Sequence, residues 1–187
     1  MNRREILSTL PIALSGCISA PSRPSRDGGD GYVIDVIDRP DPEAYSIEFA
    51  VSYPDEERVV ADLQIAVTAN ADETVGISTD PPRPFGILAG KEVDGAGSLA
   101  FWSADYETSD LVGTEGHSLT QMTQPGLITR LQPGESVRST YSVRRDAELG
   151  SVTTNLLPGI YEVVGVGSDL FEVNGTSPDV TLQISES

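Results

Sequence analysis

The sequence holds very few of the residues on which metal, redox and nucleophilic sites depend. It has one cysteine, Cys17, and one histidine, His117, among 187 residues. A single cysteine allows no internal disulfide, and with one histidine it cannot supply the usual ligands of a zinc or iron–sulfur site. No G-x-S-x-G elbow and no complete phosphate-binding glycine loop occurs either. We therefore expect a protein that is not an enzyme and that needs no cofactor.

Basic residues are scarce as well. The chain has 12 of them, with Lys91 the one lysine, against 29 acidic residues, so its formal net charge is −17. Nucleic-acid phosphates require a basic surface, and a nucleic-acid partner is therefore not expected. The acids are spread along the whole chain, a pattern that resembles proteins of salt-loving archaea, where molar salt shortens the Debye length to ~3 Å. The alternative is that the acidity attracts cations or one basic partner.

The N-terminus has the order of a secretory signal. Arg3 and Arg4 precede a run of apolar and small residues that ends at Cys17. The apolar run of about ten residues is shorter than the ~20 that a membrane-spanning helix needs, so residues 1–16 are predicted to be a signal peptide. The arginine pair resembles a twin-arginine export signal, and Leu14-Ser15-Gly16-Cys17 resembles a lipobox. The resemblance implies a lipid on Cys17 that anchors the exported protein to the outer face of the cell membrane.

The segment after the cysteine is predicted to be a flexible linker. Residues 17–31 are rich in Pro, Ser and Gly and offer almost nothing to bury. About fourteen residues reach roughly 45 Å when fully extended. The alternative reading of Cys17 is a buried thiol in a helix.

Residues 32–187 show the two-residue hydrophobic period of half-buried strands. It is clearest in residues 59–68 and 180–184, and in residues 135–144, where Arg144 falls on the outer face. The Val-rich residues 160–167 are expected to be buried on both faces. Residues 80–85 are expected to form an extended polyproline segment. The secondary structure of residues 109–123 is the least certain. Short strands separated by Pro-Gly and Asn-Gly turns predict an all-β, immunoglobulin-like antiparallel β-sandwich.

Two Pro-Gly turns carry a family resemblance. The stretches Leu131-Gln132-Pro133-Gly134-Glu135-Ser136 and Leu157-Pro158-Gly159-Ile160-Tyr161 are similar to those of the intracellular proteinase inhibitor family. The resemblance implies that each turn starts a strand and that Tyr161 packs under its corner. It also implies an alternative function, inhibition of a protease of the cell envelope. No reactive-site residue transfers from that family.

Several polar residues are candidates for a site. His117 is expected to be a surface or hydrogen-bonded histidine rather than a catalytic one. The oxygen-rich loop of Asp105, Glu107, Asp110 and Glu115 is expected to be solvated, with a Ca²⁺ site as the alternative. Asn174-Gly175-Thr176 matches the N-glycosylation acceptor pattern in an exported, turn-like position.

The sequence thus favours a lipid-anchored extracytoplasmic domain that binds another protein or a surface polymer without catalysis. Two alternatives remain, an envelope proteinase inhibitor and a lipoprotein that binds a solute or calcium.

Overall fold

The computed structural model describes residues 31–38, 42–70, 72–167 and 170–187. The predicted signal peptide, Arg3, Arg4 and Cys17 lie outside these residues, as does the linker up to residue 30. Within the described part of the chain, no helix is long and apolar enough to cross a membrane.

The described residues form an all-β fold, and the predicted fold class is confirmed at this level. Its elements in chain order are β1 (Tyr32–Asp38), β2 (Tyr45–Ser52), β3 (Val59–Ala69), β4 (Val75–Thr79), β5 (Leu88–Glu92), β6 (Ser98–Trp102), α1 (Asp105–Thr108), β7 (Val112–Glu115), β8 (Ser118–Met122), β9 (Leu127–Leu131), β10 (Ser136–Arg144), β11 (Glu148–Leu149), β12 (Val152–Thr153), β13 (Gly159–Gly165), β14 (Glu172–Val173) and β15 (Thr181–Glu186).

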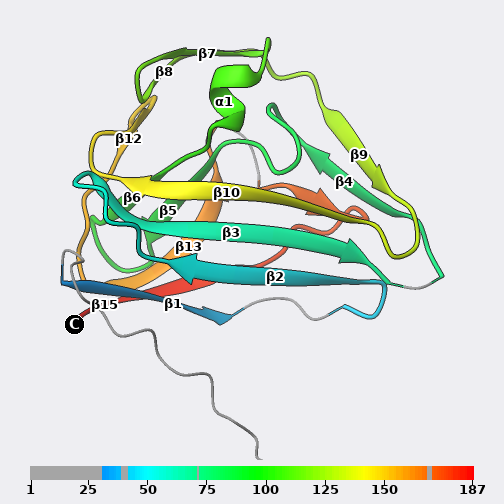
Figure 1. Ribbon diagram of the computed structural model, residues 1–187, viewed down its shortest axis with the longest axis horizontal. Helices are drawn as coiled ribbons and strands as arrows, with labels where there is room; N and C mark the ends of the chain where they lie inside the picture. Colours follow the sequence, from blue (N-terminus) through cyan, green and yellow to red (C-terminus); the bar gives the residue numbers. More distant parts are fainter. Residues whose placement is uncertain (1–30, 39–41, 71, 168–169) are drawn as a thin grey trace, which may run out of the picture.

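One antiparallel sheet dominates the described residues. Its strand order is β1-β15-β13-β5-β6-β10-β3-β2, and its two edge strands β1 and β2 lie near each other, so the sheet is nearly closed (Figure 1). Across this seam, the Tyr53 hydroxyl accepts a hydrogen bond from Ile34 N at 2.8 Å and donates one to Ile34 O at 3.3 Å. Because β6 pairs with both β5 and β10, the two layers expected of a sandwich are joined into one continuous sheet.

Two smaller sheets complete the fold. One has the order β12-β11-β8-β7 and the other β14-β4-β9. In Figure 1 the β7–β8 hairpin lies with α1 at the top of the molecule, while β4 and β9 lie at its right side. The region 109–123, the least certain in the sequence, therefore contains a β-hairpin.

The core follows the predicted alternation. On β3 the side chains of Leu63, Ile65 and Val67 are buried, and the residues between them are partly exposed. On β10 Tyr141 and Val143 face the same interior. Burying one large aliphatic side chain stabilises a fold by about 1.5–3 kcal/mol, so this lining of the sheet is the main source of stability.

The structure contradicts two expectations for strands. The Val-rich segment is not buried on both faces, because Tyr161 and Val163 point inward while Ile160 is 47% exposed, and its strand ends at Gly165. Arg144 is not exposed to solvent, as the alternation suggested, but is buried. Its guanidinium bonds Asp146, and His117, the other partner of Asp146, packs on Trp102, so neighbouring segments cover the arginine.

The segment of residues 80–85 also differs from the expected extended polyproline form. Gly86 N donates a hydrogen bond to Pro82 O at 2.8 Å, which closes a compact turn. Phe85 is 1% exposed and packs against Phe171 with ring centroids 4.8 Å apart. Buried apolar contacts therefore override the local preference of the prolines for an extended chain.

Tyr161 forms the corner that the family resemblance implied. It is fully buried, and its hydroxyl donates to Leu157 O at 2.8 Å and accepts from Leu157 N at 3.1 Å. A tyrosine that bonds the backbone a few residues upstream fixes the corner between a loop and the next strand.

Candidate functional site

The densest polar cluster of the described residues lies where β10 ends. The Arg144 side chain is 10% exposed, and its Nη1 lies 2.7 Å from Glu56 Oε1. Its Nε donates to Asp146 Oδ1 at 2.9 Å. The two carboxylates that hold the guanidinium come from the loops before β3 and after β10.

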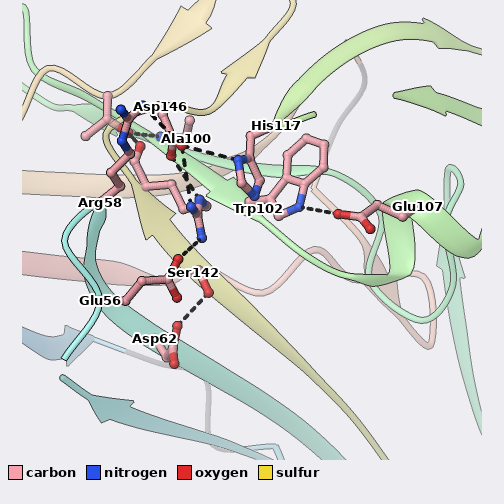
Figure 2. A network of polar contacts seen from close by, with 11 residues as sticks. Glu56, Arg58, Asp62, Ala100, Trp102, Glu107, His117, Ser142 and Asp146 are labelled. Carbon is pink, nitrogen blue, oxygen red and sulfur yellow. Dashed lines mark hydrogen bonds and ion pairs between the residues drawn. The ribbon is translucent and has the colours of Figure 1, made fainter. Parts of the chain in front are cut away.

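His117 joins this cluster from the β7–β8 hairpin. Its Nδ1 lies 3.3 Å from Asp146 Oδ2, and its ring meets Trp102 edge-on with centroids 5.2 Å apart. Trp102 Nε1 in turn donates to Glu107 Oε1 at 3.3 Å. Figure 2 shows Asp146 between Arg58 and His117, and Trp102 next to Glu107. His117 is thus paired with Asp146 and packed on Trp102, with 31% of its side chain exposed.

The charges of the cluster hold each other ionised. Burial alone raises the pKa of Asp146, but hydrogen bonds from Arg144 and the charges of Arg144 and His117 outweigh it and lower the pKa. Burial lowers the pKa of Arg144, and its hydrogen bonds to Asp146 and Glu56 outweigh that effect and raise it. Both groups therefore stay charged across the neutral range.

These contacts fasten the β7–β8 hairpin to the barrel. Glu148 N donates to His117 O at 2.9 Å, and Ser118 Oγ donates to Glu148 Oε2 at 3.3 Å. The imidazole of His117 itself contacts Asp146 and Trp102. The chemistry of the cluster is that of a structural clamp.

The four acidic candidates of the 105–115 loop do not converge. Asp105 Oδ2 accepts hydrogen bonds from Ser139 Oγ at 2.5 Å and Ser103 Oγ at 3.2 Å. Glu107 accepts from Trp102, and Asp110 and Glu115 are exposed. Within the described residues, no group of three or more His, Cys, Asp or Glu side chains is arranged to hold a metal ion.

Asn174 has a structural task of its own. Its φ of 52° and the φ of 76° at Gly175 belong to the tight turn that follows β14. Asn174 Oδ1 accepts a hydrogen bond from Gly76 N at 2.9 Å, which ties this turn to β4. Asparagine and glycine are the residues that accept such backbone conformations, so the acceptor pattern also has a conformational reason. Glycosylation of Asn174 stays a prediction.

The sequence did not single out Arg144, Asp146 or Glu56. The signal was weak, because Arg-Arg-Asp at a strand end is ordinary and the partner Glu56 lies 88 positions away from Arg144 in the sequence. The sequence did single out His117, yet not its contact with Trp102.

Comparison with known proteins gives one match. Residues 1–166 match a family described as a domain of unknown function, DUF8130. The chain belongs to the DUF8130 family. No curated protein and no solved structure matches it.

The residues that match DUF8130 cover most, but not all, strands of the main sheet. The match begins at residue 1, so it takes in the N-terminal segment, and it ends just after β13. β15 lies outside the match although it pairs with both β1 and β13 in the main sheet.

Proposed function

We propose that this DUF8130 protein is an exported lipoprotein, anchored through Cys17 to the outer face of the membrane, whose β domain binds a protein or a surface polymer without catalysis. The observation that carries the proposal is the order of the N-terminal residues: Arg3-Arg4, a short apolar run, then Leu14-Ser15-Gly16-Cys17. The family match includes this segment, which supports a role for it beyond this one chain.

The geometry of the domain is compatible with a single tether. Ser187 N donates to Gly31 O at 2.6 Å, so the described chain starts and finishes at the same place. A linker between Cys17 and Gly31 that reaches roughly 45 Å leaves the whole domain surface accessible to a partner. The proposed binding role also fits the polar cluster around Arg144, whose groups are occupied with one another.

We extend the proposal to two finer points. The acidity of the chain, with a net charge of −17, supports adaptation to molar salt, which screens repulsion between exposed carboxylates. The corner at Tyr161 supports an immunoglobulin-like ancestry of the sheet and, with it, the inhibitor alternative within the binding class.

In-cell cross-linking of the full chain tests the binding role, with a Cys17→Ser variant as the unanchored control. The proposal predicts that one outer-face protein or polymer recurs with the native chain and is depleted with the variant. If that partner is a protease which the purified chain inhibits in molar salt, the function is inhibition. Recovery of the native chain without any recurrent partner would contradict a binding role.

A further inference from the structure

The two halves of the main sheet have different outer faces. The first half, β2, β3 and β10, is here called the polar half; its outward residues are small or polar, as in the row Arg138, Ala66 and Glu48. No large hydrophobic side chain is exposed on these three strands, all of whose residues are described. The second, β5, β13, β15 and β1, is here called the aliphatic half. At its strands and their ends, the exposed side chains include Ile37 (48%), Val93 (49%), Leu157 (40%) and Ile160 (47%).

Val93 and Ile160 are neighbours on this face, and together with the exposed Leu157, three residues before Ile160, they are here called the aliphatic patch. Val93 N donates to Ile160 O at 2.9 Å, so these two residues are neighbours on adjacent chain segments. Leu157 lies just before β13, on which Ile160 points outward. Scattered exposed aliphatic residues need no explanation, but three that adjoin on an otherwise acidic chain do.

The chain holds this patch rigid from beneath. The Tyr161 hydroxyl bonds both backbone groups of Leu157. Glu92 Oε2 accepts from Gly97 N at 2.7 Å and fixes the loop that carries Val93. A Cβ at Gly97 would collide with the Tyr161 hydroxyl, so the loop packs directly on the corner. A surface that is ordered before it binds loses less conformational entropy on association.

The rim of the patch is acidic. Asp94 follows Val93, and Glu162 lies two residues from Ile160 on the same outer face; both are exposed. In the row across the sheet, Ile160 pairs with Gln183, which pairs with Asp35. Lys91, opposite Glu162, is the one basic residue in these rows. The surroundings of the apolar centre are therefore net negative.

We propose that the aliphatic patch is a docking surface for a protein whose contact area has an apolar centre ringed by lysine or arginine. This names the partner class and rests on the proposed binding function. Charge complementarity selects this occupant, because basic side chains in direct contact with Asp94 and Glu162 lie within the ~3 Å that molar salt leaves unscreened, whereas a second copy or an anionic lipid would bring like charges to that distance.

Methyl-resolved NMR of the full chain tests the proposal with three synthetic peptides of equal length. One alternates Leu and Lys, one Leu and Glu, and one Ser and Lys. The proposal predicts that the Leu/Lys peptide shifts the methyl signals of Val93, Leu157 and Ile160 first. It also predicts that this peptide binds about tenfold or more tightly than either of the others, since the apolar and the basic parts each contribute.

Matched variants locate the binding. Ile160→Thr keeps a β-branched residue on the strand and should weaken Leu/Lys binding about tenfold. Ile128→Thr is the control, because Ile128 is 54% exposed but lies on β9, outside the patch; its affinity should equal that of the native chain. Unchanged strand signals in both variants would show that each is folded.

Four results would overturn the proposal. The first two are that the Ser/Lys peptide, or the Leu/Glu peptide, binds as tightly as the Leu/Lys peptide. The third is that both variants lose the same affinity for the Leu/Lys peptide, and the fourth is that the patch signals shift without peptide, on raising the protein concentration or adding phosphatidylcholine vesicles. The first would indicate nonspecific charge attraction, the third nonspecific apolar attraction, and the last a second copy or lipid as the occupant. None depends on Cys17, so a failure of the proposed anchoring remains a separate result.

Discussion

The polar half and the aliphatic half of the sheet share one interior and differ on the outside. Inside, β10 contributes Tyr141 and β13 contributes Tyr161, both fully or almost fully buried. Outside, the polar half presents small and polar residues, and the aliphatic half presents Val93 and Ile160. The shared interior accounts for folding, and we assign the outer difference to the proposed binding role. The predictions below test this division, from the largest expected effect to the smallest.

Breaking the clamp at the end of the polar half should have the largest effect on stability. Asp146→Asn removes a charge that faces the buried Arg144 guanidinium, so we expect the free energy of unfolding to fall by about 2–3 kcal/mol. Glu56→Gln is the matched control on the same guanidinium. Glu56 is 55% exposed, and its loss should cost less than about 1 kcal/mol. Equal losses in urea unfolding would show that Asp146 is not the buried partner.

The loss of stability at acid pH should depend in part on Asp146. The pKa of Asp146 is lowered in the folded state, so its stabilising contribution is present above the ordinary aspartate value of about 3.9 and is lost as pH falls through the folded pKa. Unfolding measured from pH 5 to lower pH should therefore show a smaller acid loss in Asp146→Asn than in the native chain. An identical acid profile in both would contradict the assignment.

Alkaline unfolding should compare the tyrosines of the two halves. Burial raises the pKa of Tyr141 far above its ordinary value, and burial raises that of Tyr161 as well. The unfolded chain therefore loses these protons first, and stability falls above about pH 10 by about 1.4 kcal/mol per pH unit for each tyrosine. Tyr141→Phe should reduce this slope at least as much as Tyr161→Phe. An alkaline slope in Tyr141→Phe that equals that of the native chain would contradict the raised pKa of Tyr141.

Removing single hydroxyl groups should separate stability from binding. Tyr161→Phe leaves the backbone groups of Leu157 without their partner, and Tyr53→Phe does the same to Ile34 at the β1–β2 seam. Each should cost about 1–2 kcal/mol. Only Tyr161→Phe should also weaken Leu/Lys peptide binding, because only Tyr161 supports the aliphatic patch. Equal weakening of peptide binding by the two variants would mean that the hydrogen bonds of Tyr161 to Leu157 do not hold the aliphatic patch in place.

The smallest effect on stability is expected at the patch itself. Ile160→Thr and Ile128→Thr both alter exposed strand residues, so each should change the free energy of unfolding by less than about 0.5 kcal/mol. A loss of several kcal/mol in Ile160→Thr would show that Ile160 serves the core, and the division between the two halves would fail.

Sequence patterns predicted the interior better than the surface. The alternation in β3 and β10 and the Pro-Gly turn before Tyr161 are local signals, and the structure follows them. The burial of Arg144 depends on residues of other segments, Glu56 and the β7–β8 hairpin, which no local pattern reports. The aliphatic patch joins Val93 to Ile160, 67 positions later, by a register that the residues of neither segment encode alone. Residues 160–167 were misread because a run of valines looks the same whether its second face meets protein or solvent.

The lipid anchor on Cys17 is the central claim, and the mass of the N-terminal peptide tests it most directly. We predict that the protein extracted from its own membranes begins at Cys17, with residues 1–16 removed and a lipid on the sulfur. A peptide that still begins at Met1 with an unmodified Cys17 thiol would contradict both the export and the anchoring of this protein.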